Sequence, residues 1–253
     1  MFLRVAALAA LLFAPSYAQA PAKTPAADAL PDAREIINRH VKAIGGRDVV
    51  LAHKSIHGQG TLTVAGSGMS GVLDIYGAAN PDRALIKVTI SGLGEIMEGF
   101  DGKNAWSIEP MTGPSVKQGK ELEQTRMDAD FFGDLRDPKQ YPTVKTVEKT
   151  EFDGRPCYKV SLIRADGSEE FDFYDVATGL RAGSLKTRET SMGPVTTTSV
   201  EGDYKTFGKM LLATSQRSTV MGVEQRITLT TVELDNVDPS VFEPPAPIKA
   251  LIK

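Results

Sequence analysis

The most regular pattern in the sequence spans residues 82–110, where apolar and polar residues alternate. A period of two residues predicts strands with one apolar face, because successive side chains of a strand point to opposite sides. A Ser-Gly-Leu-Gly run and an Asp-Gly pair divide the stretch, and both are typical of turns between strands. The apolar positions of the three strands include Ile86, Val88, Ile90, Trp106 and Ile108. We therefore predict three adjacent antiparallel strands that form part of a curved sheet.

The same alternation continues on both sides of this stretch, with turn residues about every ten positions, as in an antiparallel meander. On the N-terminal side the inward positions are Leu62, Val64, Leu73 and Ile75. In the last predicted strand the apolar parity shifts between Leu229 and Val232, which predicts a bulge. In total we expect about ten or eleven strands in one continuous sheet, and so many strands imply strong curling.

Two segments follow a helical period instead, and the first covers residues 33–44. Asp32, with a glutamate three positions later, is a capping signature at its start, and two glycines follow its end. One face of this helix carries Ile37, Val41 and Ile44. We expect that face to pack against the sheet.

The second helical period covers residues 119–136, between Pro114 and Pro138, where a helix can begin and end. Phe132 belongs to its repeating stripe, and Phe131 and Leu135 widen that stripe. The two phenylalanines are candidates for contact with a ligand. Two interpretations of this pair stay open, either packing of the helix against the sheet or a lid over a ligand. In both cases we expect the segment to cover the hollow of the curved sheet.

The composition is that of a globular protein, with 41% hydrophobic and 24% charged residues. The net charge of -3 and the lack of a Lys/Arg cluster argue against nucleic acid as a partner, because such binding needs concentrated positive charge. The single cysteine, Cys157, cannot form an internal disulfide. We interpret it as a small buried residue.

Residues 1–20 have the three parts of an export signal: a basic Arg4, an apolar run, and small residues before a cleavage site. The apolar run is too short to span a bilayer. We expect cleavage after Ala18 or Ala20, and a flexible leader over residues 21–30. The sequence thus predicts an exported protein with no transmembrane segment after cleavage.

Candidate catalytic and metal-binding residues are few. The histidines are His40, His53 and His57. The last two are four positions apart, but no third ligand stands at a normal spacing, so we predict no metal site. The sequence has no nucleophile elbow and no phosphate-binding loop. The acidic residues Glu95, Glu98 and Glu109 are interpreted as solubilising residues of exposed strands, and we predict neither a cofactor nor an enzymatic activity.

Several motifs stand in order along the chain. They are Ile-Gly-Gly-Arg at residues 44–47, Gly-Phe-Asp-Gly-Lys-Asn-Ala-Trp at 99–106, Phe-Tyr-Asp-Val-Ala-Thr-Gly-Leu at 173–180, Gly-Asp-Tyr-Lys at 202–205 and Val-Phe-Glu-Pro at 241–244. In this order they resemble the outer-membrane lipoprotein-sorting proteins, relatives of the LolA and LolB lipoprotein carriers. The resemblance covers nearly all of the chain after the signal, and most of its motifs are turns.

The resemblance implies an α+β, mostly β fold. It consists of a single curved antiparallel sheet of about eleven strands, an open half-barrel, whose concave face is closed by the N-terminal and mid-chain helices. We assign residues 31–245 to this one domain and residues 246–253 to a loose tail. The implied function is that of a periplasmic carrier or binding protein for a lipid or a lipoprotein acyl chain. We expect a monomer, with an envelope protein as a second partner.

The expected lining of the hollow follows from the inward positions of the strands and from the mid-chain helix. It comprises Leu62, Val64, Leu73, Ile75, Ile86, Val88, Ile90, Trp106, Ile108, Phe131 and Phe132. Trp106 has two interpretations, as a residue of a filled core or as part of the cavity wall. Two other functions also stay open: an envelope scaffold with a packed hollow, and an unrecognised hydrolase.

Overall fold

A computed structural model describes residues 29–190 and 193–252. The predicted signal peptide and most of the leader lie outside the described residues. The helices are α1 (Ala33–Ala43), α2 (Arg47–Ala52), α3 (Gly119–Asp128), the 3₁₀ helices η1 (Gly133–Leu135) and η2 (Pro239–Phe242), and α4 (Ala246–Lys249). The strands are β1 (Ser55–Val64), β2 (Ser70–Ala78), β3 (Arg83–Ile90), β4 (Gly94–Phe100), β5 (Ala105–Glu109), β6 (Gly113–Lys117), β7 (Thr143–Phe152), β8 (Arg155–Ile163), β9 (Glu169–Asp175), β10 (Arg181–Thr190), β11 (Gly193–Phe207), β12 (Met210–Val220) and β13 (Val223–Leu234).

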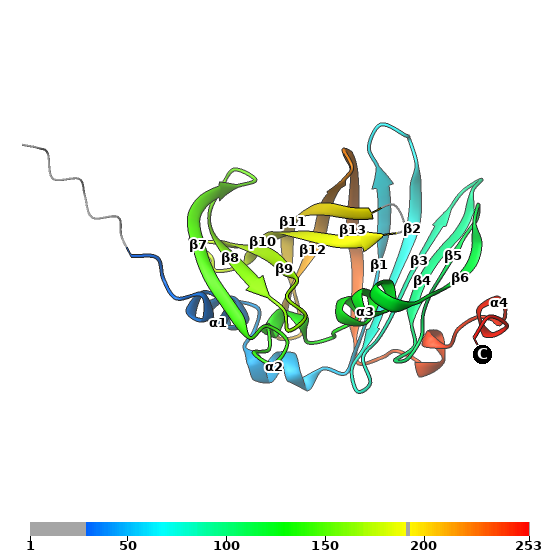
Figure 1. The fold of residues 1–253 in the computed structure, drawn as a ribbon, viewed down its shortest axis with the longest axis horizontal. Coiled ribbons are helices and arrows are strands. Elements are labelled where there is room, and N and C mark those ends of the chain that lie inside the picture. The colour runs from blue at the N-terminus through cyan, green and yellow to red at the C-terminus, as the bar shows by residue number, and fades with distance from the viewer. Residues whose placement is uncertain (1–28, 191–192, 253) are drawn as a thin grey trace, which may run out of the picture.

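All of these strands belong to one sheet of 13 strands, in the order β6-β5-β4-β3-β2-β1-β13-β12-β11-β10-β9-β8-β7. Every neighbouring pair is antiparallel. The strands form two meanders, β1 to β6 and β7 to β13, which join where β1 pairs with β13. The sheet curls around a hollow and stays open between β6 and β7 (Figure 1). The prediction of a single curved antiparallel sheet is therefore confirmed.

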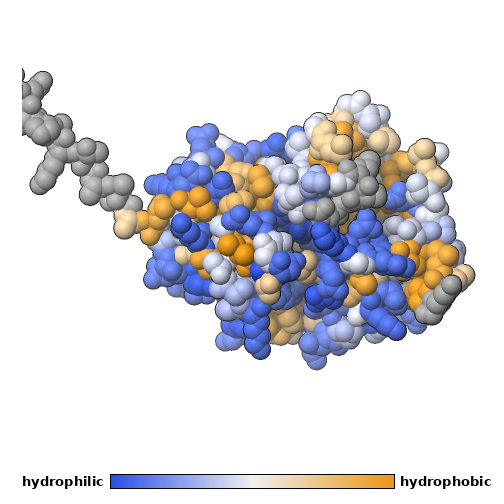
Figure 2. All heavy atoms as spheres, viewed as in Figure 1, coloured by the Kyte–Doolittle hydropathy of each residue, from blue (hydrophilic) through white to orange (hydrophobic). Residues whose placement is uncertain are grey.

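The chain crosses from one edge of the sheet to the other between β6 and β7, and this connection carries α3 and η1. Leu122 and Ala129 pack there on Phe100 and Ala105 of the concave face. Figure 1 shows α3 in front of the hollow, between the two halves of the sheet. In the space-filling view of the same face, hydrophilic residues cover much of the surface, and hydrophobic residues gather near the C-terminal helix (Figure 2).

The N-terminal helix α1 closes the other half of the hollow. Asp32 caps it by accepting from the backbone N–H of Arg34 at 2.8 Å, as its sequence position predicts. The helix ends at two glycines, and a Cβ on Gly45 would lie 2.5 Å from the carbonyl oxygen of Lys209. Its apolar face packs on the concave side of β8 and β9. The buried residues of that cluster include Ile37, Val41, Ile44, Tyr141, Val160, Leu162 and Tyr174.

The structure corrects two of the predicted elements. Strand β6 was not predicted, because its Gly-Pro-Ser sequence is typical of a turn. The sheet therefore has 13 strands rather than the predicted number of about eleven. The predicted helix over residues 119–136 ends at Asp128. Beyond it, Arg136 adopts a left-handed backbone with φ of 46°, and its carbonyl accepts from the side chain of Arg34, so tertiary hydrogen bonds replace helical ones.

The bulge predicted in the last strand is present. Gln59 pairs with Thr231 and Gly60 with Leu229, so Thr230 of β13 is the extra residue that the register leaves without an opposite residue in β1. The extra residue restores the apolar side chains on both sides of it to the same face of the sheet. In the described part of the chain, no helix has the length and apolar character needed to cross a membrane.

The C-terminal segment differs from the predicted loose tail. Residues 246–249 form α4, and Ile248 is 0% exposed. It packs in one buried cluster with Trp106, Leu85 and Phe242. These side chains belong to the convex face of the sheet, so η2 and α4 cover the outside of the half-barrel near β5 and β6 (Figure 1).

Candidate functional site

An apolar floor is formed where the concave faces of β1, β2, β3, β12 and β13 meet. Register places Ile75 of β2 opposite Ile86 of β3, on the same face as Leu73. Across the junction of the two meanders, Leu62 of β1 lies opposite Ile227 of β13. The alternation of these strands therefore puts aliphatic side chains of both meanders into one cluster inside the curve.

Two cavities lie above this floor, with volumes of about 220 and 290 Å³. The residues that line both are Ile44, Ile56, Ile75, Asp134 and Leu212. Because they share these walls, the cavities are two lobes of one hollow, which we call the apolar hollow. Ile86 lines the larger lobe and is 41% exposed although it lies on the inner face. The protein's own side chains therefore leave this apolar surface unfilled.

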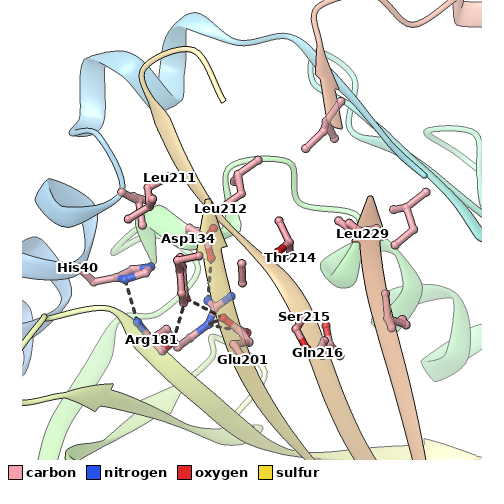
Figure 3. A pocket seen from close by; sticks show the side chains of 16 residues that line it. His40, Asp134, Arg181, Glu201, Leu211, Leu212, Thr214, Ser215, Gln216 and Leu229 are labelled. Atoms are coloured by element: carbon pink, nitrogen blue, oxygen red, sulfur yellow. Dashed lines mark hydrogen bonds and ion pairs between the residues drawn. The ribbon is translucent and has the colours of Figure 1, made fainter. Parts of the chain in front are cut away.

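One side of the smaller lobe is charged rather than apolar. The guanidinium of Arg181 donates through Nε to Glu201 Oε1 at 2.9 Å and through Nη1 to Asp134 Oδ1 at 2.7 Å. The hydroxyl of Tyr204 donates to the carbonyl of Arg181 at 2.8 Å. Figure 3 shows Asp134, Arg181 and Glu201 on one side of the cavity and Leu229 on the other. The hollow is thus amphipathic, with a hydrogen-bonded wall beside a long apolar floor.

His40 reaches this wall from α1 and is 2% exposed. Its Nδ1 accepts from the backbone N–H of Arg181 at 3.2 Å, so the ring proton resides on Nε2. Nε2 has no hydrogen-bond partner among the described residues. Burial lowers the pKa of His40 from 6.5 to about 4, because the surroundings disfavour the imidazolium, and the guanidinium of Arg181 acts in the same direction.

This pKa predicts a pH dependence of stability. Below about pH 6.5 His40 is protonated in the unfolded state, whereas in the folded state it is protonated only below about pH 4. The contribution of the neutral His40 to the free energy of unfolding should therefore be fully present above about pH 6.5. As the pH is lowered from 6.5 to about 4, the free energy of unfolding should fall by about 3 kcal/mol. Urea unfolding at about pH 7.5 and pH 4.5 measures this difference in the free energy of unfolding. His40→Leu is expected to reduce the difference between the two pH values. The control, His53→Gln, is expected to keep it. Equal pH effects in wild type and His40→Leu would contradict the assignment.

A buried ion pair supports the charged wall from the sheet side. Arg136 donates through Nε to Asp172 Oδ2 at 2.8 Å, and the hydroxyl of Tyr174 donates to the same oxygen at 2.9 Å. Asp172 is fully buried on β9. The Arg136 guanidinium holds the pKa of Asp172 below its usual value, against the effect of burial. The pair anchors the connection after α3 to the concave face of β9.

Most of the predicted lining residues do share the concave face. Leu62, Val64, Leu73, Ile75, Ile86, Val88 and Ile90 lie on it by strand register. Ile75, Ile86 and Phe131 line the cavities themselves, while Leu73, Val88 and Ile90 are buried in their own cluster farther along the sheet. Phe131 lies beside Gly77, where an added Cβ would be 3.4 Å from its ring. Phe132 instead joins the buried cluster beneath α1.

Trp106 and Ile108 are corrected by the structure. Both lie on the convex face, in the cluster with Ile248, and neither contacts the hollow. The ring of Trp106 covers Gly99 of the neighbouring strand, where a Cβ would lie 2.3 Å from it. The alternation predicted an apolar face for this strand, but it did not show that the C-terminal segment would cover that face.

The sequence reasoning missed the charged wall. His40, Asp134, Arg181 and Glu201 stand on four different elements, and no local motif links them. A signal existed at Asp172, which alternates with Phe171 and Phe173 in a strand. Phe171 and Phe173 pack in a cluster on the convex side, whereas the side chain of Asp172 faces inward.

The other histidines and the acidic residues have local partners. His53 Nδ1 lies 2.7 Å from Asp235 Oδ2, and His57 Nε2 lies 2.9 Å from Asp74 Oδ1. The acidic residues noted in the sequence include Glu95, which pairs with Lys87 on the convex face, and Glu98, which pairs with Lys117 on the concave face. In the described ranges no three His, Cys, Asp or Glu side chains converge to hold a metal ion.

Comparison with known proteins gives a structural likeness only. No family model and no curated protein matches the sequence. A DUF1329 family protein from Desulfovibrio piger is 11% identical, with a TM-score of 0.57 over 85% of this chain and 98% of that one. An outer-membrane lipoprotein-sorting protein domain from Vibrio parahaemolyticus is also 11% identical, with a TM-score of 0.56 over 83% of this chain and 95% of that one.

A third structure is a LolA superfamily protein from Nitrosomonas europaea. It is 10% identical, with a TM-score of 0.51 over 85% of this chain and 99% of that chain. At such low identity the likeness concerns the fold rather than the site residues. The chain has the LolA-like fold, an open antiparallel half-barrel with helices in its hollow.

Proposed function

We propose that this protein is an exported carrier or binding protein for a hydrophobic ligand, a lipid or the acyl chain of a lipoprotein, in the periplasm of the bacterial envelope. The observation that carries the proposal is the apolar hollow, with Ile86 exposed on its inner surface. Exposed aliphatic surface inside a curved sheet is unfavourable in water and gains free energy when an apolar ligand covers it.

The magnitude of this gain fits a binding role. Each buried methylene contributes about 0.8 kcal/mol, so about ten methylenes supply about 8 kcal/mol before the entropic cost of association is subtracted. The hollow combines aliphatic walls with a small number of fixed polar groups, as small-molecule sites do.

Two further features support the envelope setting. The sequence of residues 1–20 reads as an export signal. One structure with the same fold is an outer-membrane lipoprotein-sorting protein domain. We propose that the protein acts as a monomer and delivers its ligand to an envelope protein or membrane.

The alternatives are a scaffold with a packed hollow and a hydrolase. The unfilled surface around Ile86 favours binding over a scaffold. Glu95 and Glu98 lie on opposite faces of β4, so they do not form a paired catalytic site. We therefore propose a non-enzymatic role.

Uptake of a fluorescent fatty acid by the purified protein tests the proposal. Ile75→Trp places a large side chain on the wall shared by both lobes and is expected to weaken binding about tenfold or more. Val72→Trp is the matched control, because Val72 stands on the same strand, points to the convex face and is 61% exposed. It should bind as wild type does.

The outcomes separate the alternatives. No uptake by the wild type, together with no lipid in an organic extract of the purified protein, would favour the scaffold. Uptake that survives Ile75→Trp would place the ligand elsewhere on the protein.

A further inference from the structure

His40 presents a buried hydrogen-bond donor that the fold itself does not use. Its Nδ1 is occupied by the backbone N–H of Arg181, and Nε2–H has no partner among the described residues. The ring belongs to the lining of the smaller lobe, and Figure 3 shows it extending from α1 toward the side chains of Asp134 and Arg181. A buried donor without a partner is unfavourable, so a ligand that supplies an acceptor gains affinity.

We infer that the ligand of the apolar hollow carries a neutral carbonyl oxygen, as in an ester or amide, which accepts the Nε2–H hydrogen bond of His40. The inference rests on the proposed function and narrows its ligand class from any apolar molecule to acyl esters and amides. The aliphatic chain then lies along the floor, and the acyl carbonyl lies at the charged wall.

The donor is held in place from several sides. Residue 40 is on the third turn of α1, whose apolar face is packed in the main core. The ring of Tyr174 stands against the imidazole with 5.5 Å between ring centroids. The bond to Nδ1 fixes the tautomer. A donor that is already oriented loses little conformational entropy when a ligand arrives.

The charges around His40 favour a neutral acceptor over an anion. Arg181 is neutralised by Glu201 and Asp134, and Arg136 by Asp172, so neither guanidinium offers an unpaired positive charge. The carboxylate of Asp134 lines both lobes and makes a free carboxylate at this wall less favourable than a neutral carbonyl. An ester or amide carbonyl meets the donor without adding charge to the wall.

The test compares two ligands in the wild type and in three variants. Methyl decanoate and dodecane have chains of equal length, and their displacement of a bound fluorescent fatty acid gives an ester-to-alkane affinity ratio. We expect this ratio to fall about tenfold in His40→Leu, which lacks a donor. It should be retained in His40→Gln, whose amide can donate from a similar position. Ile227→Val is the control in the apolar wall and should weaken both ligands equally.

A measurement on the wild-type protein makes the test independent of how the variants fold. In protein with ¹⁵N-labelled histidine, methyl decanoate should shift the Nε2 and Nε2–H resonances of His40, while dodecane should not. Displacement by both ligands with an unchanged ratio and unmoved resonances overturns the inference and leaves the proposed function standing. Failure of both ligands to displace the probe overturns the proposed function itself.

Discussion

Replacement of Ile248 by alanine is expected to lower the free energy of unfolding by about 2–5 kcal/mol. Its side chain is fully buried against Trp106 and Phe242 on the convex face. Truncation removes apolar surface from the cluster and leaves a cavity that the sheet beneath cannot fill. Urea unfolding followed by circular dichroism gives the free energy directly.

Leu251 supplies the matched control, because it follows α4 by two residues and is 48% exposed. Leu251→Ala should change the free energy of unfolding by less than about 0.5 kcal/mol. Trp106 is the only tryptophan, so its emission reports on this cluster. The emission should shift to longer wavelength in Ile248→Ala and stay unchanged when a fatty acid fills the hollow. Equal effects of the two alanine variants would show that α4 does not hold the convex cluster together.

Arg136→Met is expected to destabilise the protein by about 3–5 kcal/mol. The variant leaves the carboxylate of Asp172 buried on β9 without its guanidinium partner, and an uncompensated buried charge is costly. The loss also releases the hydrogen bond from Arg136 to the carbonyl of Gly133, which shapes the turn after α3. Equilibrium unfolding of the purified variant measures the effect.

Two controls separate the buried charge from a simple loss of side-chain volume. In the double variant Arg136→Met with Asp172→Leu no charge is left unpaired, so much of the lost stability should return. Arg126→Met removes the partner of Glu123 from an exposed pair on α3 and should cost less than about 1 kcal/mol. A double variant as unstable as the single one would show that packing, not charge, dominates at Arg136.

The strands were predictable because each meander hairpin is encoded locally. In β3 the alternation of Ile86, Val88 and Ile90 specifies which side chains share a face, and the glycines at the next turn permit the reversal. The bulge opposite Gly60 was predictable for the same reason, since a shift in apolar parity needs an extra residue. The cap at Asp32 was predictable from a side chain that bonds within its own turn.

The faces were harder to predict than the strands. Alternation shows that Trp106 and Ile108 share a side, but both sides of this half-barrel carry apolar clusters. The apolar cluster on the convex face is buried because the C-terminal segment folds back over it. The burial of Ile248 could not be predicted either, because the short segment after Pro244 and Pro245 has no periodicity that indicates burial.

The charged wall beside the hollow was the part of the site that the sequence did not reveal. It joins α1, η1, β10 and β11, whose residues lie up to 161 positions apart between His40 and Glu201. Such a group has no characteristic spacing in the sequence, because its members come together only when segments that are far apart in the chain pack in the folded sheet.

The sequence by itself determined the periodic elements, the turns, the end caps and the antiparallel meander, since each depends on interactions among residues close in the chain. The tertiary structure decided which face lies inside, what covers the outside, and where Arg181, Asp134 and His40 meet. Those outcomes depend on the pairing of β1 with β13 and on the long crossing from β6 to β7, and no local pattern of side chains specifies them.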